Sequence, residues 1–226
     1  MMVSINTWLS NWRNIVSWNY LVDRMDFNFI NTVINQSRFE YSHPLHPWIT
    51  PDMIKILQNL LREDDVGFEF GSGNSTVWFA QNTKFIHSVE HDRGWFNKVK
   101  KMIQIHHLKL NTDLIYVKQQ TEIEYIKPIS KIKNNSLDYC FVDGIFRDQC
   151  VLSCIPKLKS SGILIVDNVD NYFPKNKISV SVRYKRDNYN KTVSPKKMKL
   201  IYETLSDWRK IWTSTGIQDT ALWIKP

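Results

Sequence analysis

Between residues 66 and 167 the chain alternates short apolar segments with amphipathic ones, and this rhythm limits the folds open to it. The apolar segments have the length and residue types of strands buried inside a sheet. The segments between them repeat apolar residues at helical spacing. The predicted strands span residues 66–70, 85–90, 113–117, 137–142 and 163–166. Because strands that alternate with helices are joined by right-handed crossovers, we expect a mostly parallel sheet.

Helices are expected before this region, and an antiparallel pair of strands after it. The first 40 residues carry apolar side chains at helical spacing, and Thr50-Pro51-Asp52 has the residue types that begin a helix. Residues 208–213 and 220–224 look like two strands joined around Gly216. The sequence therefore predicts an α/β fold of the Rossmann-like, doubly wound kind, with N-terminal helices and an antiparallel C-terminal hairpin.

The size and composition of the chain fit one folded domain with a short extension. Its 226 residues are within the usual size of a domain, and 42% of them are hydrophobic. We expect residues 1–48 to form a helical extension or cap and residues 49–226 to form the main domain. No stretch of about 18 apolar residues is present, so no membrane partner is expected. Three cysteines, Cys140, Cys150 and Cys154, fit neither a zinc site nor disulfide pairing, which predicts buried free thiols in a cytoplasmic protein.

The positive charge of the chain is concentrated in one segment. The formal net charge is +8, and between Lys175 and Lys210 eleven Lys and Arg residues stand against three Asp and Glu residues. The rest of the chain is neutral by the same count, with 19 basic and 19 acidic residues. A concentrated basic segment attracts anionic partners. An acidic small-molecule substrate, a nucleic acid or simple solvation of a loop would each explain it.

The strongest functional signal is the segment Glu69-Phe70-Gly71-Ser72-Gly73-Asn74-Ser75-Thr76, where a predicted strand hands over to a helix. Backbone N–H groups at such a junction face the ligand crevice of an α/β sheet. Gly71 and Gly73 allow a tight turn and the close approach of a ligand. Nineteen residues after Gly71, Glu90 ends the second predicted strand, where a carboxylate can accept both hydroxyls of a ribose. Together these features predict a nucleoside-binding site.

The acidic residue in this segment favours one kind of nucleoside. A dinucleotide site has a third small residue where this sequence has Thr76, and no phosphate-binding lysine follows. Glu69 stands two residues before the first glycine, where it would repel a pyrophosphate but attract an ammonium group. The methionine part of S-adenosylmethionine carries such an ammonium group. We therefore expect this methyl donor as the cofactor.

Residues 68–76 and 88–92 resemble the first two motifs of class I S-adenosylmethionine-dependent methyltransferases. The resemblance runs from about Pro47 to the C-terminal end, and makes residues 49–226 the methyltransferase domain. It implies a seven-stranded sheet whose last strand is antiparallel. It places the adenine contact among residues 119–122. The cofactor-binding residues that it implies are Glu69, Gly71, Ser72, Gly73, Ser75, Thr76, Glu90, His91 and Asp143.

A second group of polar residues follows the fourth and fifth predicted strands. Asp143 and the pair Asp167-Asn168 would meet at one edge of a parallel sheet, where their oxygens suit Mg²⁺ or Ca²⁺. These positions resemble the metal site of catechol and caffeoyl-CoA O-methyltransferases, which implies a metal that activates the acceptor hydroxyl. Those enzymes carry a lysine where this chain has Phe146, and Arg147 stays protonated and cannot replace it as a base. The alternatives are a substrate clamp made with Arg147, or a helix cap and a turn.

The expected activity is methyl transfer to an oxygen of a small polar metabolite or sugar, with an anionic acceptor as one option. Positioning supplies most of the acceleration in such a displacement, so few catalytic residues are needed. Asp143 is the residue expected nearest to the transferred methyl group, as a metal ligand or as a base. One alternative is an RNA methyltransferase that uses the basic residues 175–210. The other is a non-catalytic module that binds a cofactor or a partner.

Overall fold

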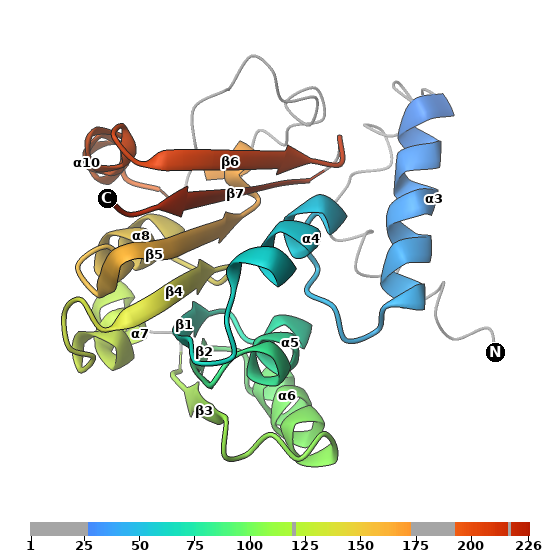
Figure 1. The fold of residues 1–226 in the computed structure, drawn as a ribbon, viewed down its shortest axis with the longest axis horizontal. Helices are drawn as coiled ribbons and strands as arrows, with labels where there is room; N and C mark the ends of the chain where they lie inside the picture. Colours follow the sequence, from blue (N-terminus) through green and yellow to red (C-terminus); the bar gives the residue numbers. More distant parts are fainter. Residues whose placement is uncertain (1–26, 119–120, 173–192, 217) are drawn as a thin grey trace.

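A seven-stranded sheet forms the centre of the molecule in the computed structural model, which describes residues 27–118, 121–172, 193–216 and 218–226 (Figure 1). The strands lie in the order β3-β2-β1-β4-β5-β7-β6. They are β1 (Val66–Phe70), β2 (Phe85–Glu90), β3 (Thr112–Tyr116), β4 (Leu137–Val142), β5 (Leu158–Asp167), β6 (Arg209–Ser214) and β7 (Asp219–Ile224). The strands β1 to β5 are parallel, whereas β7 runs antiparallel to both β5 and β6. The predicted fold class is confirmed.

Helices cover both faces of this sheet. They are α3 (Phe27–Ser42), α4 (Pro51–Leu60), α5 (Asn74–Asn82), α6 (Arg93–Ile105), α7 (Glu122–Ser130), α8 (Arg147–Cys154), α9 (Val169–Tyr172) and α10 (Pro195–Leu205). Helices α4 and α5 pack on one face, and α7, α8 and α10 pack on the other. Helix α6 lies beside α5 and β3, and α3 stands at the carboxyl edge of the parallel strands (Figure 1). The result is the three-layer architecture of a doubly wound fold.

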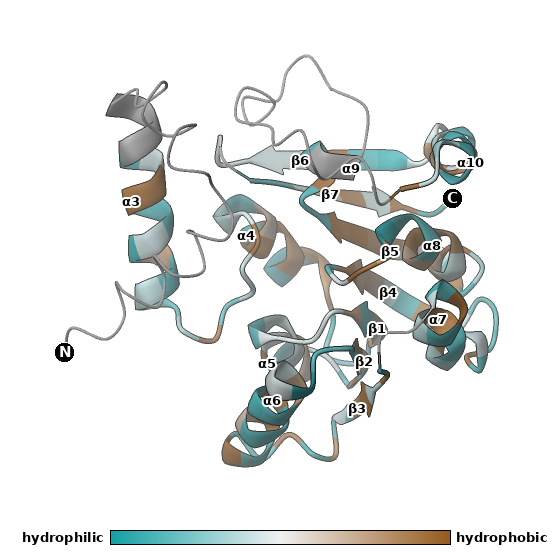
Figure 2. Ribbon diagram, turned by 180° about the vertical axis from the view of Figure 1, so that it is seen from behind, coloured by the Kyte–Doolittle hydropathy of each residue, from teal (hydrophilic) through white to brown (hydrophobic). Residues whose placement is uncertain are grey.

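The helices on the two faces are packed against the sheet by side chains that alternate along the strands. In β4, Cys140 packs against α8 on one face, while Phe141 packs toward α4 and α5 on the other. Because both faces are covered, the carboxyl-terminal halves of β4 and β5 are apolar and buried (Figure 2). Polar residues stand where these two strands end, since Asp143 follows β4 and Asp167 ends β5. The site is found at these strand ends.

The structure differs from the sequence prediction in two neighbouring elements. The apolar spacing of residues 147–158 predicts a helix up to Leu158, with a break at Ser161-Gly162. Helix α8 ends instead at Cys154, and β5 begins at Leu158, well before the predicted start at residue 163. Leu158 pairs with Leu137, and an irregularity in the register follows before Tyr139 pairs with Ile163. The predicted break at Ser161 therefore lies inside the strand, where Ser161 takes a left-handed conformation with φ of 64°. Helix α7 was not predicted.

The cysteines can be compared directly with the expectation from the sequence. The three cysteines are buried and free, as predicted. No helix in the described part of the chain is long and apolar enough to cross a membrane. Residues 1–26 of the expected N-terminal helix, and residues 175–192 of the basic segment, lie outside the described residues.

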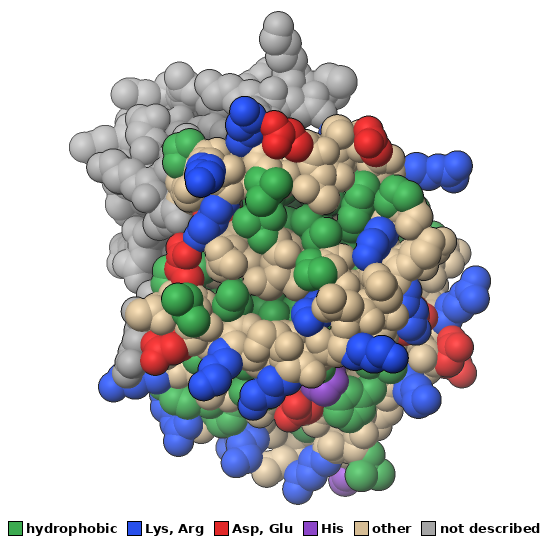
Figure 3. All heavy atoms as spheres, turned by 90° about the vertical axis from the view of Figure 1, so that its left-hand side faces the viewer, with side chains coloured by type: hydrophobic (Ala, Val, Ile, Leu, Met, Phe, Trp, Pro, Cys, Tyr) green, Lys and Arg blue, Asp and Glu red, His purple; other side chains and the backbone are tan. Residues whose placement is uncertain are grey.

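Figure 3 views the amino-terminal edge of the parallel strands, where Lys and Arg side chains are spread among acidic ones.

Candidate active site

The candidate site lies where the order of the strands changes direction. β1 and β4 are neighbours, but the strands continue through β2 and β3 on one side and through β5 on the other. Ligands of open α/β sheets bind outside the carboxyl ends of strands at such a point. A cavity of about 660 Å³ lies there, within the range of about 300–1,000 Å³ usual for small ligands. Its walls are formed by residues that follow β1, β2 and β4, together with Trp48.

The glycine turn after β1 uses its two glycines differently. Gly71 has φ of +92°, and a Cβ atom there would lie 2.7 Å from the backbone nitrogen of Gly144, the glycine after β4. Both facts require glycine, because no other residue would fit the conformation and the space. Gly73 is extended, and a Cβ atom would come no nearer than 3.7 Å to Ser75 and Trp95. A side chain at Gly73 would thus be tolerated by the fold but would enter the cavity.

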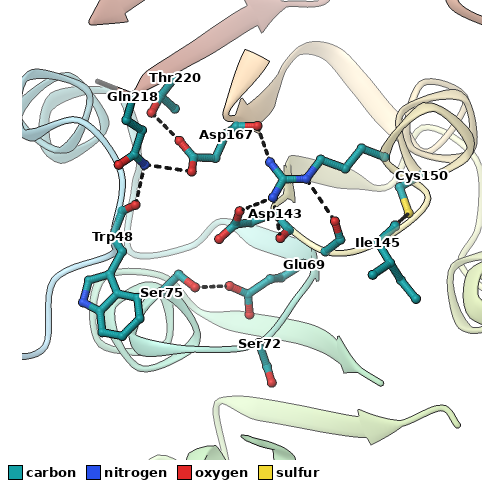
Figure 4. A network of polar contacts seen from close by, with 12 residues as sticks. Trp48, Glu69, Ser72, Ser75, Asp143, Ile145, Cys150, Asp167, Gln218 and Thr220 are labelled. Carbon is teal, nitrogen blue, oxygen red and sulfur yellow. Dashed lines mark hydrogen bonds and ion pairs between the residues drawn. The ribbon is translucent and has the colours of Figure 1, made fainter. Parts of the chain in front are cut away.

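Glu69 lies beneath the cavity wall and has no exposed surface. Its carboxylate accepts hydrogen bonds from the hydroxyls of Ser75, Thr76 and Ser88, and the last two measure 2.5 Å (the contact with Ser75 is drawn in Figure 4). Burial raises the pKa of Glu69 to about 7, although the three hydroxyl donors oppose that rise. Glu69 would therefore act on a ligand through Ser75, which lines the cavity.

Glu90 is a buried carboxylate at the cavity, fixed from several directions. One oxygen accepts the backbone N–H of Ser72 at 3.0 Å and its hydroxyl at 3.1 Å, and the other accepts the N–H groups of His91 and Asp92. Nδ1 of His91 lies 3.1 Å from the same second oxygen. Burial alone would raise the pKa of Glu90, but these donors outweigh it and lower the pKa. Glu90 is thus held ionised and in one orientation.

Two tryptophans at the cavity were not predicted as site residues. Trp95 is in the first turn of α6, and its Nε1 donates to the carbonyl of Ser72 in the glycine turn. Trp48 lies 5.9 Å from Trp95 between ring centroids and is 47% exposed. Trp95 could have been suspected from its position five residues after Glu90, at the start of the helix that follows the acidic strand end. Together the two indoles form an apolar part of the cavity wall.

Asp143 lines the cavity directly after β4 and is paired with Arg147 of α8. Nη2 of Arg147 donates to Oδ1 of Asp143 at 2.8 Å and to its carbonyl oxygen at 3.0 Å. Nε of Arg147 donates to the carbonyl of Gly144 at 2.9 Å, and Nη1 donates to the carbonyl of Asp167. Burial raises the pKa of Asp143, and the charge of Arg147 opposes this. The guanidinium therefore joins the ends of β4 and β5.

The side chain of Asp167 points away from Arg147 and toward β7. Its Oδ1 accepts the hydroxyl of Thr220 at 2.6 Å, and its Oδ2 accepts Nε2 of Gln218 at 2.8 Å (Figure 4). Nε2 of Gln218 also donates to the carbonyl of Trp48 at 2.6 Å. Burial raises the pKa of Asp167 to about 8, with a further contribution from the charge of Asp143. Asp167 thus anchors the segment that carries Trp48.

The residues at the expected metal site do not fit a divalent cation in this arrangement. Both carboxylate oxygens of Asp167 accept protein donors, and a guanidinium lies between the carbonyl of Asp167 and the carboxylate of Asp143. Among the described residues, no group of three His, Cys, Asp or Glu side chains is arranged to hold a metal ion. Asn168 has a left-handed backbone with φ of 50°, as in the turn that was the alternative expectation.

The structure brings most of the predicted cofactor residues together at one cavity. Those that line it are Gly71, Ser72, Gly73, Ser75, Glu90, His91 and Asp143. Glu69 and Thr76 lie behind the wall with no exposed surface, and Asp167 and Asn168 are not part of the lining. Of the predicted adenine segment, residues 119–120 lie outside the described residues, and Glu122 begins α7.

Comparison with known proteins supports the fold but finds no relative by sequence. No protein-family model and no curated protein matches the chain. A solved structure described as a candidate caffeoyl-CoA O-methyltransferase from Staphylococcus aureus has a TM-score of 0.59 at 16% identity, covering 97% of this chain and 98% of that one. An O-methyltransferase from Bacillus cereus in complex with S-adenosylhomocysteine has a TM-score of 0.57 at 14% identity, covering 92% and 96%.

A methyltransferase from Geobacter sulfurreducens is similar at a TM-score of 0.52 and 13% identity, covering 87% of this chain and 89% of that one. Likenesses at such low identity establish the fold. The chain has the Rossmann-like fold of class I methyltransferases. Two of the solved structures it resembles are described as O-methyltransferases, one of them with bound S-adenosylhomocysteine.

Proposed function

We propose that this chain is an S-adenosylmethionine-dependent methyltransferase that methylates an oxygen of a small molecule. One observation carries the proposal: at the switch point of the sheet, a single cavity joins an ionised Glu90 to an open Gly73 and to Asp143. A fixed carboxylate at the end of β2 suits the two hydroxyls of a ribose. The open backbone at Gly73 suits the methionine part. The fold shared with O-methyltransferases supports this assignment.

The chemistry needs little beyond alignment of donor and acceptor. The acceptor oxygen attacks the methyl carbon of the sulfonium, the carbon–sulfur bond breaks, and S-adenosylhomocysteine leaves as a neutral thioether. The proton of the acceptor hydroxyl passes to the carboxylate of Asp143, which lines the cavity and is oriented by Arg147. The step conserves charge, because the positive sulfonium and the negative carboxylate are both neutralised.

The proposed acceptor is a small polar metabolite or a sugar, and two residues of the cavity support this proposal. The indole of Trp48 offers a flat apolar surface, on which the carbon face of a sugar ring can stack. Asp143, which lines the same cavity, offers a hydrogen-bond acceptor for one of the hydroxyls of that ring. An indole and a carboxylate in one cavity favour a ring that carries a hydroxyl.

The first experiment is a calorimetric titration of S-adenosylmethionine, and then of S-adenosylhomocysteine, into the purified protein. We expect saturable binding that Gly73→Ala abolishes while leaving the melting temperature unchanged, because a Cβ atom at Gly73 enters only the cavity. Glu90→Ala should also abolish binding. Glu63→Ala, at an exposed residue away from the cavity, is the control and should bind normally.

The two possible failures of this proposal have different meanings. If neither ligand binds the folded wild-type protein, the chain is not a methyltransferase of this kind. If both ligands bind but no methyl group is released to any member of a broad acceptor panel, the fold serves as a cofactor-binding module. In that second case there is no methyl transfer for Asp143→Ala to reduce. The effect of the substitution is then limited to the loss of the ion pair with Arg147.

A further inference from the structure

A positively charged side chain, that of Arg147, lies among the residues that resemble a metal site. The guanidinium of Arg147 lies between the ends of β4 and β5, where it contacts the carboxylate of Asp143 and three backbone carbonyls. Arg147 is only 9% exposed, yet it borders the cavity. An always-charged, planar donor held by four acceptors is a fixed positive charge. It stands beside the carboxylate nearest the proposed acceptor.

We propose that this chain transfers its methyl group without a divalent metal, and that Arg147 is the positioning residue that takes the place of the metal. The inference rests on the proposed function, since it concerns the acceptor side of the same cavity. Arg147 supplies the positive charge that holds Asp143 in one rotamer through the bond between Nη2 and Oδ1. A metal ion at Asp143 would lie next to this bond and would meet the like charge of the guanidinium.

The second carboxylate is committed to a structural task. Both oxygens of Asp167 accept hydrogen bonds from β7 or the residue before it, namely from Thr220 and Gln218. Gln218 in turn holds the carbonyl of Trp48. Recruiting Asp167 to a metal would therefore break the contact that places an aromatic wall of the cavity. Two of the three positions of the resemblance, Asp143 and Asp167, thus fix two walls of a metal-free site.

The absence of a metal changes how many oxygens the acceptor needs. A metal that binds its substrate directly favours two neighbouring oxygens, which can occupy two coordination positions. A site built on Asp143 and Arg147 makes no such demand, because one hydroxyl can donate to the carboxylate. The inference therefore extends the acceptor class to molecules with a single reactive hydroxyl.

The test is a titration of Mn²⁺ alone into the wild-type protein saturated with S-adenosylhomocysteine, with free Mn²⁺ followed by electron paramagnetic resonance. We expect no stoichiometric binding at up to about 1 mM free Mn²⁺. One Mn²⁺ bound per chain at micromolar concentration, and lost in both Asp143→Asn and Asp167→Asn, would overturn the inference. Mn²⁺ that still binds both variants lies elsewhere and leaves the inference standing.

A variant distinguishes exclusion by Arg147 from a simple lack of affinity. Arg147→Met removes the guanidinium but keeps an aliphatic stem, so it leaves Asp143 without its cation. We expect this variant to bind Mn²⁺ at least about tenfold more tightly than wild type, and Arg147→Met combined with Asp143→Asn to lose the gain. A folded Arg147→Met protein that binds no more Mn²⁺ than wild type would contradict the assignment.

The matched control lies at the other end of the same two strands. Lys159 of β5 pairs with Asp138 of β4 at 2.6 Å, so Lys159→Met removes a cation from a carboxylate away from the cavity. It should gain no Mn²⁺ binding. If Arg147→Met fails to fold, the wild-type titration and Arg147→Lys, which should still exclude Mn²⁺, decide the question. Binding of S-adenosylhomocysteine is measured separately, so its absence would count against the proposed function and not against the exclusion of metal.

Discussion

Glu69 combines complete burial with three hydroxyl donors, and its ionisation is linked to the stability of the whole protein. Its pKa is raised from 4.5 to about 7 in the folded state, mainly by burial. The folded protein therefore keeps this proton at pH values where the unfolded chain has lost it. By linkage, the stabilisation is fully present below about pH 4.5 and is lost as the pH rises through about 7.

We predict that Glu69→Gln flattens this part of the pH dependence. The wild-type free energy of unfolding should fall between pH 5 and pH 8 by an amount on the order of 3 kcal/mol from this group alone. The amide that this substitution introduces imitates the protonated acid, so the variant should lose that decline. Urea unfolding at several pH values measures the effect, with the exposed Glu63→Gln as the control. Equal slopes in wild type and Glu69→Gln would show that Glu69 is already ionised at low pH.

The segment around Trp48 shows how single hydrogen bonds position an element. Nδ2 of Asn74, in the first turn of α5, donates to the carbonyl of Pro44 at 3.0 Å. Gln218 holds the carbonyl of Trp48, and the N–H of Thr50 donates to Thr220. The expected cap of α4 is only partly realised, because the hydroxyl of Thr50 contacts Thr213 of β6 and not the helix. The segment is therefore held by α5 on one side and by Gln218 and β7 on the other.

We predict that Gln218→Met loosens this segment without unfolding the sheet. It removes the bonds to Trp48 and Asp167, and each lost bond should cost about 1–3 kcal/mol where the partner is left buried. Hydrogen exchange of the backbone amides of residues 43–50 should become faster. The control Gln81→Met changes an exposed residue of α5 and should leave exchange unchanged. Unchanged exchange in Gln218→Met would show that the segment is held by packing alone.

The elements that the sequence predicts well are those with a local cause. β1, β2 and β4 have the predicted bounds, because a short apolar segment between polar ends permits one register in a buried sheet. The start of β5 was missed because its first residues are mostly exposed, and only pairing with β4 makes them a strand. Helix α7 was missed because Pro128, a residue that usually interrupts a helix, lies inside it.

In the candidate site, too, the residues with a local sequence signal were predicted. Gly71, Gly73 and Glu90 could be predicted because the glycine turn and the acidic strand end lie within about one strand–helix–strand unit of the sequence. The bonds from Gln218 to Asp167 and to Trp48 span 51 and 170 residues. No periodicity in the sequence reports contacts over such distances. The alternative use of Asp167 as an anchor therefore required the structure.

At the scale of the molecule, stability comes from apolar clusters on both faces of the sheet. Leu57 of α4 has no exposed surface and packs in the cluster that contains Phe141 and Ile165. We predict that Leu57→Ala lowers the free energy of unfolding by about 2–5 kcal/mol, because a cavity remains in the core. Leu110→Ala, at a residue that is 90% exposed, should change it by less than about 0.5 kcal/mol. Urea unfolding compares the two, and equal effects would contradict the packing described for α4.

The ties between Trp48 and Gln218 and between Thr50 and Thr220 also set an order of events during biosynthesis. These partners are 170 residues apart, and at a translation rate of about 5–20 residues per second the second member emerges roughly 10–30 seconds after the first. The glycine turn and Glu90 emerge early in that interval, whereas the segment with Trp48 waits for its anchor. A nascent chain on the ribosome thus assembles its donor pocket first and its acceptor wall last.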